Sequence, residues 1–141
     1  MSTNHRQQLT AAAQILGLEL TTPQVDALLE YLALIQKWTK VYNLTAVRDP
    51  NEMLTHHLID SLAVIGPLRR QIAQMRADGH VGEGTAKLLD VGSGAGLPGV
   101  VIAICCPDIR VDCVDTVGKK AAFIQQVAAT LKLPNLRGIH A

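Results

Sequence analysis

The sequence has no long hydrophobic run, few aromatic residues, few cysteines and no excess of charge of either sign. No apolar stretch approaches the ~20 residues that a membrane-spanning helix needs, and residues 1–7 lack the apolar core of a signal peptide. We therefore expect a cytoplasmic protein that does not enter a membrane. Apolar residues nevertheless make up 48% of the chain and charged residues 18%, which is typical of a globular domain.

The three cysteines exclude a disulfide framework, because their number is odd and two of them, Cys105 and Cys106, are adjacent. Their spacing does not suit a metal site either, so we expect buried thiols in a reducing compartment. The net charge of +1 gives no general attraction for nucleic acids. Any contact with a nucleic acid would therefore have to come from a local basic patch.

The first half of the chain is predicted to be helical. Apolar residues recur at helical spacing in residues 4–16, and Gly17 ends this segment. Thr22 and Pro23 then suit the N-cap and the first position of a longer helix. Its apolar stripe is typical of a helix packed on a core (Leu28, Tyr31, Leu32, Ile35 and Trp38).

A further helix is predicted to begin at residues 49–52, where an acidic N-cap is followed by proline and glutamate in the manner of a capping box. We expect it to end near Gly66–Pro67 and to be followed by a second, arginine-bearing helical piece. The polar, glycine-rich residues 78–84 form a connector. We place the boundary there, with residues 1–84 as a helical segment and connector and residues 85–141 as an α/β part.

The most informative stretch is residues 88–99. It begins as an apolar run, contains four glycines within eight residues, and leads into the apolar residues 100–105. A fully buried strand, a tight turn and a helix give this pattern. Glycines there permit positive φ and the close approach of a ligand, and Pro98 suits the first turn of the helix. The free N–H groups at the start of that helix are expected to point toward the ligand.

Two classes of ligand fit this loop. The spacing Gly94-x-Gly96-x-x-Gly99 matches the dinucleotide fingerprint, in which a pyrophosphate binds the helix N-terminus. The spacing Asp90-x-Gly92-x-Gly94-x-Gly96 instead resembles the first motif of S-adenosylmethionine-dependent methyltransferases, where the acidic residue faces the cationic methionine part of the cofactor. The Asp90 carboxylate favours this class, because it attracts a sulfonium and an ammonium and repels a pyrophosphate. A glycine-rich turn without a ligand is the third alternative.

A second acidic residue, Asp115, ends the short apolar run 109–114, about twenty residues after the glycines. A nucleotide site of an α/β fold has a carboxylate there, which accepts hydrogen bonds from both ribose hydroxyls. Asp115 also suits a helix N-cap, and the two roles are compatible. Asp112, inside the run, is expected to face solvent or to lie at a sheet edge.

After Asp115 we predict a helix with one apolar face and, beyond a turn at Pro134–Asn135, a third strand at residues 136–139. A doubly wound sheet normally has about five strands or more and is covered by helices on both faces. The first strand is therefore expected to keep an unpaired side. We interpret the chain as a fragment of a longer protein; the alternative is that a second chain completes the sheet.

Several motifs together resemble one family. The chain contains, in this order, Trp38-x-x-x-Tyr42-Asn43-Leu44-Thr45, Arg48-Asp49-Pro50-x-Glu52, His57-x-x-Asp60-Ser61 and the loop of residues 90–99, followed by Asp115 and Lys119. From about residue 9 to its end, this sequence resembles the bacterial small-subunit ribosomal RNA methyltransferase G family, once called glucose-inhibited division protein B.

The resemblance implies a Rossmann-like methyltransferase fold behind a helical segment. It implies S-adenosylmethionine as the methyl donor and guanine N7 in the 530-loop region of 16S rRNA, within the small ribosomal subunit or its precursor, as the acceptor. By resemblance, the cofactor-binding residues are Gly92, Gly94, Gly96 and Leu97, and Asp115 binds the ribose; Asp90 is the acidic residue of the first motif.

The family continues past Ala141 into segments that supply the adenine contacts and part of the RNA site. We therefore expect the 141-residue chain alone to be weakly active or inactive. The resemblance also implies that His57, Asp60 and Ser61 lie near the site. Family members often have arginine or lysine where His56 stands, so a basic contact is expected to be weaker here.

The chemistry requires little of the protein, because guanine N7 has an in-plane lone pair and no proton to remove. Catalysis would consist of alignment and favourable electrostatics, so we assign no catalytic residue. The i,i+4 pairs formed by His56 with Asp60 and by His57 with Ser61 are more typical of helix neighbours than of a hydrolase triad. The alternative functions are an NAD-type dinucleotide-binding domain and a non-catalytic fragment or interaction module.

Contact with RNA is expected near the Asn43–Thr45 loop, because several basic side chains gather around it in the sequence. The candidate RNA-binding residues are Lys40, Arg48, His56 and His57, with Lys37 as a further member of the patch. Two adjacent histidines make a poor metal pair, and no metal is expected.

Overall fold

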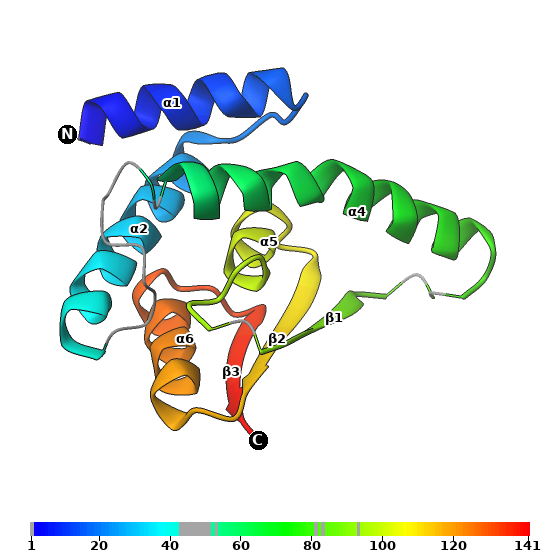
Figure 1. Cartoon of the computed structure of the whole chain (residues 1–141). Coiled ribbons are helices and arrows are strands. Elements are labelled where there is room, and N and C mark those ends of the chain that lie inside the picture. Colours follow the sequence, from blue (N-terminus) through cyan, green and yellow to red (C-terminus); the bar gives the residue numbers. More distant parts are fainter. Residues whose placement is uncertain (1, 43–51, 53, 81, 83, 93) are drawn as a thin grey trace.

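The computed structural model describes residues 2–42, 52, 54–80, 82, 84–92 and 94–141. Helices fill the first half of the chain and a βαβαβ arrangement fills the second (Figure 1). The predicted α/β class with an N-terminal helical segment is therefore confirmed. The elements are α1 (Ser2–Ile15), α2 (Thr22–Tyr42), the π-helix η1 (Leu54–Ile59), α4 (Asp60–Ala77), β1 (Ala86–Val91), α5 (Gly99–Cys105), β2 (Ile109–Asp115), α6 (Gly118–Thr130) and β3 (Leu136–His140).

The three strands form one parallel sheet in the order β1-β2-β3. Leu88 of β1 aligns with Val111 of β2, which in turn aligns with Leu136 of β3. Right-handed crossovers that proceed in one direction put their helices on the same face of a sheet. Accordingly, α5 and α6 lie on one side of the sheet (Figure 1). This is the arrangement of one half of a Rossmann-like fold.

β1 is not the fully buried strand that the sequence indicated. Ala86 and Leu88 face the core, but the alternate residues Leu89 and Val91 are 64% and 71% exposed. A strand is buried on both sides only when helices cover both faces of its sheet, and the described helices cover one. The face with Leu89 and Val91 is called the open face below; Val114 and Ile139 continue it on β2 and β3.

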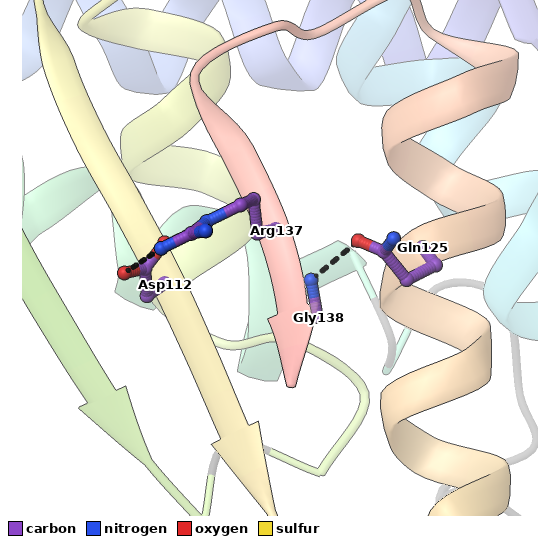
Figure 2. A network of polar contacts seen from close by, with 4 residues as sticks. All are labelled: Asp112, Gln125, Arg137 and Gly138. Atoms are coloured by element: carbon purple, nitrogen blue, oxygen red, sulfur yellow. Dashed lines mark hydrogen bonds and ion pairs between the residues drawn. The ribbon is translucent and has the colours of Figure 1, made fainter. Parts of the chain in front are cut away.

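Two contacts tie the outer strand β3 to its neighbours (Figure 2). On the open face, the Arg137 guanidinium donates to both carboxylate oxygens of Asp112, at 2.9 and 2.8 Å. On the other side of the strand, the Gly138 N–H donates to Oε1 of Gln125 in α6, at 2.7 Å. Asp112 therefore faces solvent, which was the first of the two predicted placements. It lies on the central strand β2 and not at a sheet edge, which was the second.

Helix α2 begins one residue earlier than the sequence indicated. Thr21 Oγ1 accepts the Gln24 N–H at 3.2 Å, and Gln24 Oε1 accepts the Thr21 N–H at 2.9 Å. This reciprocal pair is a capping box with Thr21 as the N-cap, so the prediction of Thr22 is wrong by one position. Pro23 then occupies the second helical position, where its missing N–H still costs no intrahelical bond.

Helix α4 passes through Pro67 instead of ending there. The proline removes one intrahelical hydrogen bond, but the same apolar side continues on both sides of it and packs on the core (Leu62, Ile65, Leu68 and Ile72). Burial of this face outweighs the loss of one bond, and the two predicted helical pieces are one helix. The predicted start at residues 49–51 lies outside the described residues.

One hydrophobic cluster joins the helical segment to the α/β part. It includes Leu28 and Leu62 from the first half of the chain and Val101 and Phe123 from the second. The Trp38 ring of α2 packs edge-on against Phe123 of α6, with 5.3 Å between the ring centroids. The boundary between residues 84 and 85 stays a prediction. Among the described helices, none has both the length and the apolar character required to span a membrane.

The three cysteines are free thiols buried in the core, as predicted. Burial raises the pKa of Cys105 to about 12, so this thiol stays protonated at neutral pH and is a poor nucleophile. The Cys105 carbonyl oxygen accepts a hydrogen bond of 2.9 Å from Arg69 of α4. These cysteines are therefore part of the packing between α4, α5 and the sheet.

Candidate functional site

The candidate site lies at the carboxyl edge of the sheet, where β1 leads into the glycine loop (residues 92–98) and β2 ends at Asp115. The first residue of the loop extends the pairing of the strands, because the Gly92 N–H donates to the Val114 carbonyl oxygen at 2.8 Å. In parallel sheets, ligands bind at this carboxyl edge. The sheet thus brings the two acidic residues predicted from the sequence to neighbouring positions.

Asp115 is tied directly to the glycine loop. Its Oδ2 accepts the Gly94 N–H at 3.2 Å, and its Oδ1 accepts the Val117 N–H at 2.8 Å. Asp115 is 9% exposed. The N-cap of α6 is Val117 rather than Asp115, so the alternative of a plain helix N-cap is wrong. The carboxylate instead joins the turn after β2 to the loop after β1.

Asp90 lies half-buried at the end of β1. Its Oδ2 accepts the Gly99 N–H at 3.0 Å. Burial raises the pKa of the Asp90 carboxyl above its ordinary value, and the Gly99 N–H opposes this by stabilising the charged form. Because a cation near Asp90 would replace part of the lost hydration, this carboxylate suits a positively charged ligand group.

The first two N–H groups of α5, which the sequence predicted to be free, both have partners within the protein. The Gly99 N–H binds Asp90, and the Val100 N–H donates to the Gly96 carbonyl oxygen at 2.7 Å. A pyrophosphate would have to compete for these donors beside a carboxylate. The local geometry therefore disfavours the dinucleotide alternative, which depends on such N–H groups.

The loop glycines serve two different purposes. Gly92 and Gly94 have positive φ, and a Cβ on either would meet nothing within 4 Å, so both border open space. Gly96 faces the opposite way: a Cβ there would lie 2.4 Å from Val100 and 2.6 Å from Ile124. Glycine is thus needed at position 96 for packing against the core, whereas positions 92 and 94 leave the outer side of the loop accessible.

The end of the loop packs closely on the strands. A Cβ on Gly99 would lie 2.6 Å from Cys113 Sγ and 2.7 Å from Asp90 Oδ2, so this glycine permits the close contact between α5 and the sheet. Leu97 is half-buried against the core, and its peptide bond to Pro98 is cis. Pro98 occupies the N-cap of α5, just before the first turn in which the sequence placed it.

One residue of the site was interpreted from the sequence only as core. The buried Tyr31 hydroxyl of α2 donates a hydrogen bond of 2.6 Å to the Ala95 carbonyl oxygen in the glycine loop. The signal available in the sequence was chemical: a tyrosine on a buried stripe needs a partner for its hydroxyl. Which carbonyl provides that partner depends on the tertiary structure.

The four candidate RNA-binding residues are described to different extents. Lys40 is exposed in the last turn of α2, and His57 is half-buried in η1. The backbone of His56 belongs to η1, but its side chain and the whole of Arg48 lie outside the described residues. In the described part of the chain, no group of three histidine, cysteine or acidic residues could hold a metal ion.

Comparison with known proteins is consistent with this geometry. The family model described as rRNA small subunit methyltransferase G matches residues 24–141. Proteins named "Ribosomal RNA small subunit methyltransferase G" are similar to the chain: one from Acidovorax sp. (strain JS42) is 64% identical over 99% of this chain, and one from Albidiferax ferrireducens is 69% identical over 96%. A third, from Polaromonas sp. (strain JS666), is 67% identical over 96%.

These relatives are longer than the chain, which spans 62%, 61% and 58% of their respective lengths. The matched part includes both acidic residues, the glycine loop and all three strands of the sheet. The identity extends through the helical segment as well, since it covers nearly the whole chain. The chain therefore belongs to the rRNA small subunit methyltransferase G family.

Proposed function

We propose that this chain forms the donor-binding part of an rRNA methyltransferase that uses S-adenosylmethionine. The observation that carries the proposal is the hydrogen bond between the Gly94 N–H and Asp115 Oδ2, at 3.2 Å. It joins the loop after β1 to the acidic end of β2, so both halves of one ligand site are held together. Gly92 and Gly94 leave the outer side of this loop open.

The residues present fit the two ends of such a donor. Asp90 would face the ammonium and sulfonium, since its half-buried carboxylate lacks part of its hydration. Asp115 would bind the ribose hydroxyls: each of its oxygens accepts one backbone N–H and keeps a further lone-pair direction. Gly96 and Leu97 complete the loop that the family resemblance assigns to the cofactor.

We infer that the acceptor is guanine N7 in the 530-loop region of 16S rRNA, on the small ribosomal subunit or its precursor in the cytoplasm. The relatives' name supports rRNA of the small subunit, and the nucleotide follows from the family resemblance. Bound S-adenosylmethionine supplies a methyl group on positively charged sulfur. The residues of this chain need only bind and orient, because guanine N7 carries no proton to remove.

The carboxylates on β2 provide a matched test of the donor site. Titration calorimetry with S-adenosylhomocysteine should detect binding to the chain, and NAD should give none. Asp115→Asn should weaken that binding by about tenfold or more, since hydrogen bonds to a charged acceptor contribute about 1.5–3 kcal/mol. Asp112→Asn, on the open face of the same strand, should leave it unchanged. Tighter binding of NAD, or equal effects of the two substitutions, would contradict the proposal.

RNA contact is proposed for the side of the molecule around the end of α2, where Lys40 is exposed. Lys40→Glu combined with Arg48→Glu should weaken binding to rRNA or to the subunit and flatten its salt dependence, because fewer counterions are then released. Lys132→Glu is the control, since this residue lies between α6 and β3 at the amino edge of the sheet. Unchanged binding by the double variant would show that Lys40 and Arg48 do not contact the RNA.

A methylation assay on 16S rRNA should compare the chain with a full-length relative. We expect the full-length protein to methylate guanine N7 and the 141-residue chain to be weakly active or inactive. The expectation rests on the adenine contacts and part of the RNA site, which the family resemblance puts after Ala141. Appreciable N7 methylation by the chain itself would refute it.

A further inference from the structure

The Tyr31 hydroxyl lies against the inner side of the glycine loop. Tyr31 belongs to α2 and its side chain is fully buried. The hydroxyl donates a hydrogen bond of 2.6 Å to the Ala95 carbonyl oxygen, and a Cβ on Gly96 would lie 3.3 Å from the hydroxyl oxygen. Helix α2 of the N-terminal segment therefore contacts the loop on its core side, while Gly92 and Gly94 border open space on its outer side.

Tyr31 is itself held in place by the core. Its ring centroid lies 6.4 Å from that of Phe123 in α6. Burial raises the pKa of Tyr31 well above its ordinary value, and the negative charge of Asp90 acts in the same direction. The hydroxyl is consequently protonated at neutral pH and available as a hydrogen-bond donor.

Three consecutive loop residues are thus fixed by three different partners. The Gly94 N–H binds Asp115 of β2, the Ala95 carbonyl binds Tyr31 of α2, and the Gly96 carbonyl binds the Val100 N–H of α5. Only the middle contact comes from outside the α/β part of the chain. Without the hydroxyl, the buried Ala95 carbonyl would lose its donor and would recover it only by turning toward water.

We propose that Tyr31 is a positioning residue of the donor site: it acts through the Ala95 carbonyl to hold the glycine loop in its binding shape. This inference rests on the proposed function, because it gives Tyr31 a purpose only if the loop binds the methyl donor. It also assigns a role to the helical segment. That segment shapes the donor site in addition to any contact it makes with RNA.

The test is Tyr31→Phe, which removes the hydroxyl and keeps the ring that packs on Phe123. Amide hydrogen exchange should become about tenfold faster at Gly94 and Val100, a local loss equivalent to about 1.4 kcal/mol, while Val111 in the central strand stays unchanged. The dissociation constant for S-adenosylhomocysteine should rise about five- to tenfold, within the range for an unsatisfied buried carbonyl.

Thr39→Val is the matched control. Thr39 is a buried residue of the same helix, and its hydroxyl has no hydrogen-bond partner in the described part of the chain. This near-isosteric change should therefore leave the exchange of the loop and the binding of S-adenosylhomocysteine as they are. A loop disturbed equally by both substitutions would mean that α2 acts by general packing, and would overturn the proposal.

Two other outcomes would also overturn it: exchange in Tyr31→Phe that is faster to the same extent at Gly94, Val100 and Val111, or exchange that is unchanged at all three. The exchange measurement needs no cofactor, so it separates this inference from the proposed function. If the wild-type chain bound no S-adenosylhomocysteine while the loop still loosened selectively, the proposed function would fail and the anchoring of the loop by Tyr31 would stand.

Discussion

Partial burial of the Asp90 carboxylate has two opposite effects. It favours the binding of a cation nearby, and it lowers the stability of the folded chain when the carboxylate is charged. Burial raises its pKa above the ordinary value of 3.8, and the Gly99 N–H offsets only part of this. As pH rises, the unfolded chain releases the Asp90 proton first. The cost to native stability is therefore absent below the ordinary carboxyl pKa, develops as pH rises toward the raised value and is complete above it.

Asp90→Asn separates these two effects. At about pH 7 the variant should be no less stable than the wild type, because asparagine carries no charge to desolvate and its oxygen can still accept the Gly99 N–H. Binding of S-adenosylmethionine should weaken by up to about fivefold, as expected for the loss of one partly exposed charge partner. Urea unfolding and titration calorimetry measure the two quantities.

The pH dependence gives an internal control for the same substitution. The affinity of the wild type for S-adenosylmethionine should fall as pH is lowered through the raised pKa of Asp90, because the cation binds the ionised carboxylate. Asp90→Asn should lack this part of the pH profile. A variant that is clearly less stable at neutral pH and binds the donor as well as the wild type would show that Asp90 is a structural residue only.

The start of α2 illustrates what an element requires from its first residues. Two threonines, Thr21 and Thr22, precede Pro23, and threonine is a favoured residue at an N-cap. The structure selects Thr21 because its hydroxyl and the Gln24 side chain satisfy each other's backbone N–H. The N3 glutamine was the sequence signal that distinguishes the two threonines.

Thr21→Ala should therefore lower the free energy of unfolding by about 1 kcal/mol, the usual contribution of an N-cap. Thr22→Ala should change it by no more than about 0.5 kcal/mol, because Thr22 is exposed in the first turn of the helix. Urea denaturation of both variants makes the comparison. A larger effect at Thr22 than at Thr21 would indicate that Thr22 is the N-cap, as first predicted from the sequence.

The unequal faces of the sheet are a property of the whole molecule. On one face, β1 and β2 pack against helices; on the other, Leu89 and Val91 are largely exposed. The ion pair of Arg137 and Asp112 occupies part of the same open face. A partly exposed pair contributes at most about 1 kcal/mol, so it does not replace a covering layer of helices.

Adjacent leucines on β1 test this asymmetry. Leu89→Thr should reduce the binding of a hydrophobic dye and the self-association of the chain, with a change in unfolding free energy within about 0.5 kcal/mol. Leu88→Thr, which alters the face that packs on the core, should cost about 2 kcal/mol or more. Sedimentation, dye fluorescence and urea unfolding distinguish the two. Equal losses of stability would mean that both faces of β1 are packed.

Much of the fold follows from local patterns. The glycine loop, the alternation of strands and helices after residue 85 and the apolar stripe of α2 all depend on spacing along the chain. Spacing also predicted the two acidic residues of the site, because strand ends in a parallel sheet share one edge. Local patterns were misleading at Pro67, where packing on the core carried the helix through a residue that usually ends one.

The sequence by itself determined the chemical groups available at the loop: two carboxylates, small residues and a helix start. Only the tertiary structure decided how they are used. It directed the Gly99 N–H to Asp90, joined Gly94 to Asp115 and brought the Tyr31 hydroxyl under Ala95. The physical reason is that hydrogen-bond partners of buried groups are chosen by proximity in space. Tyr31 and Ala95 are neighbours because α2 packs beneath the loop, although 64 residues separate them along the chain.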